Sequence, residues 1–160
     1  MKFMYSFTCV FALINIFSCN KQSTKSEARY TLVVFKIENA LGQNLFDPAT
    51  TGYYRPENIK VFYLVNGEEK LYSKPNLDYP HGYRILNSSA IGYYMTIFAN
   101  TEATESPTTT YIDWGNGDKD TLVCAMNKKD GVYQMITDAW YNNEKINNIA
   151  GGLNILKIVK

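Results

Sequence analysis

The amino-acid sequence predicts an all-β fold. From residue 30 onward, short runs rich in β-branched and aromatic residues recur at close intervals, and such runs are typical of strands. Glycine, asparagine and aspartate stand between most of them, as tight turns require. No long stretch has apolar residues at the spacing of an amphipathic helix. Eight or nine short strands of this kind favour a β-sandwich, most simply an immunoglobulin-like one, with a small β-barrel as the alternative.

The first expected strands flank a recognisable turn. Residues 31–37 form a long apolar run, which predicts burial on one face and partly on the other. Residues 59–65 form the second strand and residues 68–72 the third. Asn66-Gly67 stands between them, and both residue types tolerate the positive φ of a type I′ turn. The spacing therefore predicts a hairpin.

The remaining strands follow the same logic. We expect strands at 83–86, 93–99, 108–114, 120–126, 132–137 and 153–159. Glycines at 115 and 117 predict a second hairpin between 108–114 and 120–126. Short helical departures are expected at 137–140 and 147–150. Residues 30–160 are long enough for a single domain that buries roughly two-thirds of its unfolded surface.

The N-terminus has the order of a secretory signal. Lys2 supplies a positive start, an apolar run follows, and Ser18 stands directly before Cys19. This order predicts a lipoprotein signal peptide over residues 1–18, with an acylated Cys19 as the mature N-terminus. A retained membrane anchor would need about twenty apolar residues. An ordinary signal peptide would have a small residue where Ile16 stands.

Residues 19–29 contain no large apolar side chain after the cysteine, so we expect a flexible tether. The membrane, reached through the lipid on Cys19, is thus the first expected partner. We expect an outer-membrane lipoprotein of the cell envelope, and the periplasmic face and the cell surface both stay open.

Charge excludes one class of partner. Removal of residues 1–18 removes Lys2 and no acidic residue, which leaves 15 basic and 15 acidic side chains. No basic block stands out, so we expect no binding to nucleic acid.

Residues for nucleophilic or metal chemistry are scarce. Cys124 is the one cysteine of the domain and lies in an apolar, strand-like run, which favours a buried hydrophobic role over a reactive thiol. His81 is the sole histidine and lies in an expected turn. One histidine and no paired cysteines make a zinc site improbable. We therefore expect no cofactor, no metal and no enzymatic role.

The segment from Asp113 to Asp120 contains several oxygen donors, including Asn116 and Asp118. Such donors suit calcium, but their order does not match an EF-hand loop. A turn in which the acids keep the strand ends soluble is the simpler interpretation, and whether it ever holds calcium stays open.

Three motifs together resemble small lipoproteins of the Bacteroidetes type. They are Asp-Trp-Gly-Asn-Gly-Asp-Lys-Asp-Thr-Leu at 113–122, Gly-Gln-Asn-Leu-Phe-Asp-Pro at 42–48 and Trp-Tyr-Asn-Asn at 140–143. The resemblance implies a β-sandwich and carries no catalytic assignment. In such lipoproteins an acidic run after the cysteine marks export to the surface, and residues 20–23 contain no acid.

Aromatic side chains near turns are the candidate ligand-binding residues, because rings with a polar tip suit sugars and protein contacts. The candidates are Tyr53, Tyr54, Tyr79, Tyr83, Trp140 and Tyr141. We expect a lipid-anchored, non-catalytic binding or structural module for a glycan or partner protein. The alternative is an envelope hydrolase or small-ligand carrier with an enclosed pocket. A third possibility is assembly through the edge of the strand at 153–159.

Overall fold

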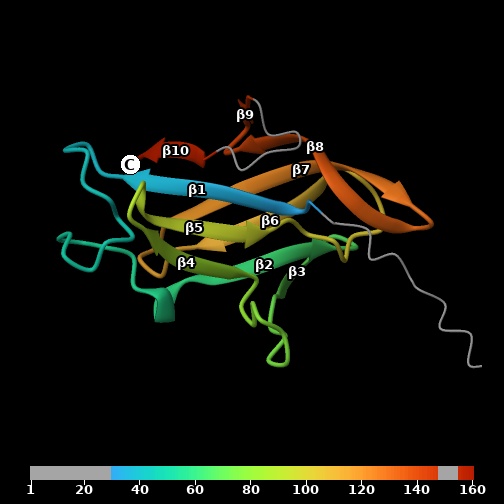
Figure 1. Ribbon diagram of the computed structural model, residues 1–160. Helices are drawn as coiled ribbons and strands as arrows, with labels where there is room; N and C mark the ends of the chain where they lie inside the picture. Colours follow the sequence, from blue (N-terminus) through green and yellow to red (C-terminus); the bar gives the residue numbers. More distant parts are fainter. Residues whose placement is uncertain (1–29, 148–154) are drawn as a thin grey trace, which may run out of the picture.

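The computed structural model describes residues 30–147 and 155–160 (Figure 1). The predicted signal peptide, Cys19 and the tether lie outside these residues. The described chain forms ten strands and one short 3-10 helix, η1, at Pro56–Asn58. The strands are β1 Leu32–Glu38, β2 Lys60–Val65, β3 Glu68–Leu71, β4 Tyr83–Ser88, β5 Gly92–Phe98, β6 Thr108–Asp113, β7 Lys119–Lys129, β8 Val132–Tyr141, β9 Glu144–Ile146 and β10 Ile155–Val159.

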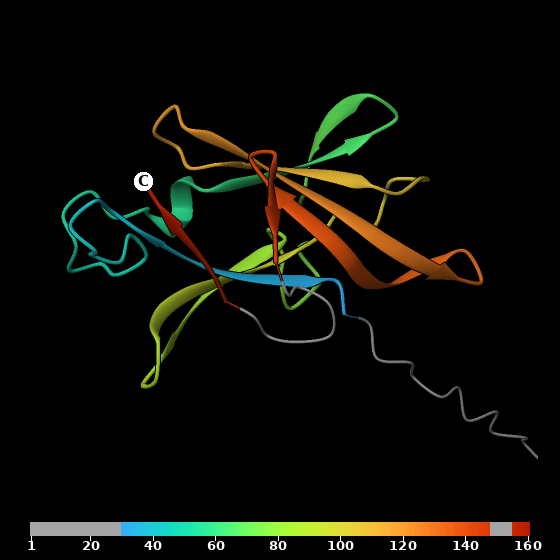
Figure 2. The same ribbon diagram turned by 90° about the horizontal axis from the view of Figure 1, so that it is seen from above.

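Two sheets lie face to face (Figures 1 and 2). One has the order β10-β1-β5-β4 and the other β3-β2-β6-β7-β8-β9. Neighbouring strands are antiparallel except for β1 and β10, which are parallel. The sheets do not close into a barrel, so the all-β sandwich is confirmed and the barrel alternative is wrong.

The hairpins follow the turn chemistry of the sequence. Asn66 and Gly67 have φ of 54° and 82° and join β2 to β3, as predicted. Asn142 and Asn143 also have positive φ, 48° and 69°, and join β8 to β9. Asparagine reaches this region more readily than most residues, so this turn forms without glycine.

One expected helical departure is wrong. Residues 137–140 continue β8, where Ala139 is fully buried and pairs with Cys124 across the sheet. Pairing with β7 and burial of alternate side chains outweigh the local signal. The polar strand β9 was not predicted. The other expected departure, at 147–150, lies outside the described residues except for Asn147.

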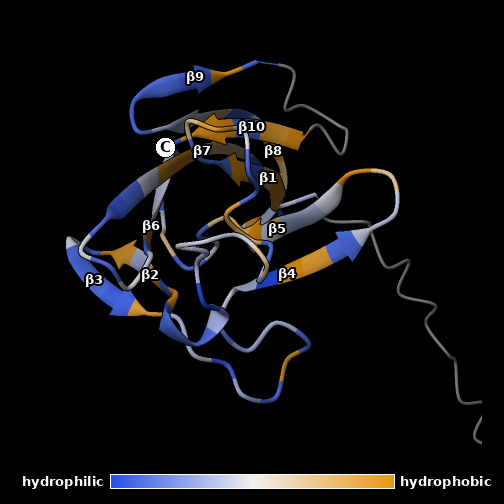
Figure 3. Cartoon of the chain, turned by 90° about the vertical axis from the view of Figure 1, so that its left-hand side faces the viewer, coloured by the Kyte–Doolittle hydropathy of each residue, from blue (hydrophilic) through white to orange (hydrophobic). Residues whose placement is uncertain are grey.

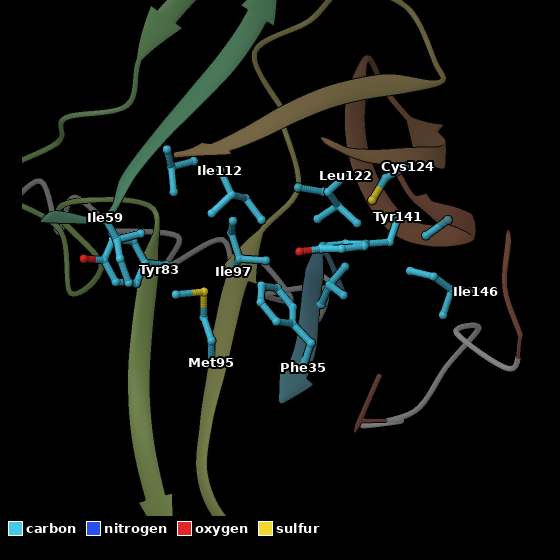
Figure 4. Packing of buried hydrophobic residues seen from close by; sticks show 14 of the residues in the cluster. Phe35, Ile59, Tyr83, Met95, Ile97, Ile112, Leu122, Cys124, Tyr141 and Ile146 are labelled. Carbon is cyan, nitrogen blue, oxygen red and sulfur yellow. The ribbon is translucent and has the colours of Figure 1, made fainter. Parts of the chain in front are cut away.

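The core fills the space between the sheets. Phe35, Met95 and Ile97 point from the smaller sheet toward Ile112 and Leu122 of the larger one, and all five are fully buried (Figure 4). Burial of each such side chain contributes about 1.5–3 kcal/mol. Hydrophilic side chains dominate the edge strands β3 and β9 (Figure 3).

Strand β10 is an edge strand with two faces. Leu156 and Ile158 pack against the core, whereas Ile155 and Val159 are exposed. This alternation is that of a strand with one face toward the core. Lys157, at the middle of the strand, pairs with Glu38 of β1, and Lys160, directly after the strand, pairs with Asp120 of β7.

The chain passes from one sheet to the other where β1 begins. The Tyr30 amide donates to the Gln134 carbonyl at 2.7 Å, and the Ile136 amide donates to the Tyr30 carbonyl at 3.1 Å. These bonds attach the segment before β1 to β8. The start of β1 therefore lies at the same end of the sandwich as the β7–β8 hairpin (Figure 1).

Candidate binding groove at one end of the sandwich

The oxygen-rich turn between β6 and β7 is held in place by hydrogen bonds to its own side chains. The Gly115 amide donates to Asp113 Oδ1 at 2.8 Å, and the Asp118 amide donates to Asn116 Oδ1 at 3.0 Å. These bonds support the turn interpretation of the sequence. Within residues 30–147 and 155–160, no group of three or more His, Cys, Asp or Glu side chains could hold a metal ion.

Asp120, at the end of this turn, is buried and heavily hydrogen-bonded. Trp114 Nε1 donates to its Oδ2 at 2.6 Å, and Asn142 Nδ2 donates to its Oδ1 at 2.7 Å. The Tyr141 hydroxyl also donates to Oδ2, and the Lys160 ammonium pairs with the carboxylate. Burial opposes ionisation, but these donors outweigh it and hold the pKa of Asp120 below its usual range. The cluster joins β7 and β8 to Lys160, the residue directly after β10, so its role is structural.

Three of the six predicted ligand-binding aromatics are core residues. Tyr54 stacks on Trp114 with ring centroids 4.7 Å apart, and Tyr141 belongs to the Asp120 cluster. The Tyr83 hydroxyl donates to the Pro56 carbonyl at 2.5 Å. All three predicted residues are at least nine-tenths buried, because the sandwich covers turn-flanking rings at its rim.

The other three are partly exposed and lie in separate places. Arg55 lies 6.0 Å from the Tyr53 ring in the loop between β1 and β2. Tyr79 packs edge-on against Phe98, with centroids 4.9 Å apart. Trp140 lies on β8 directly across from Val123 and Lys145. Only Tyr79 contacts the groove described next, through Phe98.

A groove of about 550 Å³ opens at the end of the sandwich where β1 begins, and we call it the end groove. It lies where β1, β2, β5 and the β7–β8 hairpin meet the loops that follow β3 and β5. Its lining residues are Thr31, Tyr63, Tyr72, Lys74, Leu77, Phe98, Thr101, Glu102, Gly131, Val132 and Tyr133.

The aromatic residues of its lining are Tyr63, Tyr72, Tyr133 and Phe98. Tyr63 and Tyr72 pack together with centroids 4.9 Å apart. The Tyr63 hydroxyl donates to the Phe98 carbonyl at 3.3 Å, which is long for this type of bond. Burial raises the pKa of both Tyr63 and Tyr72 above the usual phenol value, so both are neutral donors at physiological pH.

The fourth ring, Tyr133, has an unusual hydroxyl. Tyr133 is 4% exposed, and its hydroxyl has no hydrogen-bond partner among the described residues. The Lys128 ammonium lies 4.3 Å from the ring centroid. Buried hydroxyls are normally paired, so this atom has an unmet capacity to donate and accept, although it is buried and only other atoms of the residue reach the groove.

The rim combines apolar and charged groups. Leu77 and Val132 are 56% and 39% exposed, which is high for aliphatic side chains. Lys74 Nζ and Glu102 Oε1 lie 3.1 Å apart, so the two charges of the lining balance each other. The groove is partly enclosed and partly open to solvent.

Sequence reasoning missed Tyr63, Tyr72 and Tyr133. Tyr63 and Tyr133 lie within strands, where tyrosine is common, and Tyr72 directly follows one. The signal that could have found them is alternation: Tyr63 shares the core-facing parity of Val61 and Val65, so its hydroxyl must end near an edge of the core.

The candidate nucleophile and base do not show an activated arrangement. Cys124 is 1% exposed, and burial raises the pKa of its thiol to about 12. The thiol is therefore protonated and shielded, as the sequence indicated. His81 is exposed in the turn before β4.

Within the described residues, no helix has the length and apolar character needed to cross a bilayer.

Comparisons with protein families, with curated proteins and with solved structures find no match to this chain.

Proposed function

We propose that this chain is a lipid-anchored, non-catalytic binding module of the cell envelope whose ligand occupies the end groove. The observation that carries the proposal is the groove itself. It combines aromatic walls, exposed aliphatic side chains at the rim and the charged pair of Lys74 and Glu102. Ligand sites have this composition, which is mostly apolar with a few placed polar groups.

The anchor in this proposal is acylated Cys19, as an outer-membrane lipoprotein. The order of Lys2, an apolar run, Ser18 and Cys19 supports it. A diacyl anchor with an additional amide-linked chain holds strongly, because each buried methylene adds about 0.8 kcal/mol. Cys124, which is buried and protonated, offers no competing reactive thiol.

The finer fold assignment is also part of the proposal. We infer an immunoglobulin-like sandwich from the parallel pairing of β1 with β10 and from the switch of the chain between sheets at Tyr30. Loops at the ends of such sandwiches are common binding surfaces. The end groove lies among loops of this kind.

A site-specific cross-link tests the binding role. A photoreactive phenylalanine analogue in place of Leu77, at the rim, should give ligand adducts in intact cells. The matched control is position 41, where Leu41 is 83% exposed in the loop that follows the far end of β1. Equal adduct patterns at both positions would contradict a ligand in the groove.

The anchor has its own test. Growth with an alkyne-tagged palmitate should label the wild-type protein and leave Cys19→Ser unlabelled. Protease treatment of intact cells, with lysed cells as control, then separates display at the surface from a periplasmic location.

A further inference from the structure

We infer that the outer edge of β4, together with a groove beside the first residue of this strand, binds an extended segment of a partner protein by strand addition. The groove has a volume of about 460 Å³ and lies where η1, β2 and the end of β3 meet the start of β4. We call it the side groove. It adjoins the end groove at Tyr72, which lines both, but the inference does not depend on a ligand in the end groove.

The edge strands differ in their protection against pairing with another chain. In the part of the chain that the structure describes, β3, β4, β9 and β10 lie at sheet edges. Three of the four residues of β3 and two of the three residues of β9 are charged, and β10 has Lys157 at the middle of its five residues. β4 has six residues, of which only Arg84 is charged, and hydrophobic residues occupy its middle (Figure 3). Shortness and charge normally prevent edge pairing, so β4 is the least protected edge.

The backbone of β4 presents donors and acceptors away from the sheet. The Phe98 amide donates to the Gly82 carbonyl at 2.9 Å, and β4 pairs with β5 along its whole length without a bulge. Because backbone groups of successive residues point to opposite sides of a strand, those of Tyr83, Ile85 and Asn87 point away from β5. Among the described residues, these groups have no hydrogen-bond partner. Their regular spacing matches the backbone of another extended polypeptide.

The side groove can receive one side chain of the added strand. Tyr83 is buried in the core and Ile85 packs against it, so alternate side chains of an added strand would lie on the same face as these two. The side chain beside Tyr83 would lie at the side groove. The apolar residues of the groove lining are Pro56, Ile59, Val61, Leu71, Tyr72 and Tyr83. The groove therefore favours an apolar side chain at this position.

The charged groups near the side groove contribute little to recognition. Glu57, Lys60 and His81 line the groove, and Arg84 follows Tyr83 on the opposite face of β4. All four are exposed and both signs are present, so solvent and salt screen them. Backbone hydrogen bonds and one apolar contact are left to supply affinity and specificity, and peptides that add to a sheet edge are recognised in this way.

A second copy of this chain fits the surface less well than a foreign segment does. In a fully overlapping antiparallel pair of two β4 strands, Ile85 lies opposite its own counterpart and Tyr83 lies opposite Asn87. The second copy would then present Asn87, and beyond it Ser89, beside the side groove. Both side chains are polar and would leave the apolar lining without a matching contact. The occupant is therefore a segment with an apolar residue at this position.

Peptide selection tests the inference. The probe is a phage-displayed library of random linear peptides, selected on the detergent-solubilised full-length protein. The selected peptides should share alternating β-branched or aromatic residues, with an apolar residue at one fixed position, and should bind in calorimetry. A selection that yields no binding peptide would overturn the inference. So would sedimentation that shows a dimer which Asn87→Pro dissociates, because the occupant would then be a second copy.

Asn87→Pro tests the backbone pairing. Asn87 is exposed and its N–H points away from β5, so proline removes this donor without breaking a bond within the sheet. The variant should bind the selected peptide about three- to tenfold more weakly and keep the urea midpoint of the wild type. The matched control, Asn87→Ala, removes the same side chain and retains the N–H, so it should bind as the wild type does. Equal affinities of the two variants would refute strand addition.

Two leucines of nearly equal exposure separate the side groove from the end groove. Leu71 is 55% exposed and lines the side groove, whereas Leu77 is 56% exposed and lines the end groove. Leu71→Asp should weaken binding of the selected peptide about tenfold, because it removes apolar contact from the lining. Leu77→Asp should leave this binding unchanged. The reverse result would place the peptide in the end groove, which overturns this inference and leaves the proposed function intact.

Discussion

Replacement of Asp120 by asparagine should be among the most damaging conservative changes in this domain. The carboxylate is 3% exposed and accepts hydrogen bonds from Trp114, Tyr141 and Asn142. Asp120→Asn keeps the shape of the side chain and removes its charge. An amide has one oxygen and one NH₂ group, so in either orientation at least one buried donor faces another donor.

The magnitude follows from these contacts. One unsatisfied buried donor costs about 1–3 kcal/mol, and Lys160 loses its most buried partner. Breaking a buried ion pair typically costs about 3–5 kcal/mol. Since both losses concern the same carboxylate, we expect a total loss of about 3–5 kcal/mol in the free energy of unfolding.

Urea unfolding followed by the fluorescence of Trp114, which is 1% exposed, measures this loss. Asp118→Asn is the matched control, because Asp118 also pairs with Lys160 but its side chain is 39% exposed. An exposed pair contributes about 0–1 kcal/mol, so the control should lose no more than that. Equal losses in the two variants would refute the reasoning.

Three further predictions concern pH, backbone and thiol chemistry. The pKa of Asp120 is lower in the folded state than its ordinary 3.8, so its contribution to stability is present above about pH 4 and is lost as the pH falls through the folded-state pKa. Measurements of the free energy of unfolding at decreasing pH should show this loss in the wild type. An identical pH profile for Asp120→Asn would contradict the prediction. Gly115→Ala should lose about 2 kcal/mol or more in urea unfolding, because Gly115 has φ of 77° and an added Cβ would lie 2.6 Å from that of Asn58; Gly117→Ala, with open space around it, should lose less. Cys124 should resist alkylation by iodoacetamide until urea unfolds the protein, because its thiol is buried and protonated. Mass spectrometry measures the alkylated fraction, and rapid alkylation of the native protein would contradict the prediction.

The strands could be predicted because alternation and turn chemistry are local properties. Asn66-Gly67 predicts a hairpin because both residues tolerate the positive φ that the turn requires. The apolar run at 31–37 predicts a strand whichever strands lie beside it. The short polar strand β9 could not be predicted in this way. It exists because Glu144 and Lys145 pair with β8, and the sequence of three residues carries no such signal.

The end groove could not be predicted from the sequence for a similar reason. Its wall joins Tyr63 and Tyr72, which one hairpin brings together, to Tyr133, which is distant in sequence and meets them only through the arrangement of the strands. Turn-flanking tyrosines were favoured because turns are usually exposed. Tyr54 and Tyr83 show why this failed: the loop that contains Tyr54 and the first residue of β4, Tyr83, both place their rings in the core.

The parallel pairing of β1 with β10 affects how the chain can be made. Val34 pairs with Ile155, about 120 positions later, so the smaller sheet stays incomplete until nearly all of the described chain has emerged. During synthesis, the nascent chain exposes one unsatisfied edge of β1 and lacks Leu156 and Ile158 in its core. Completion of the smaller sheet, and of the part of the core that Leu156 and Ile158 cover, therefore depends on the last strand of the described chain.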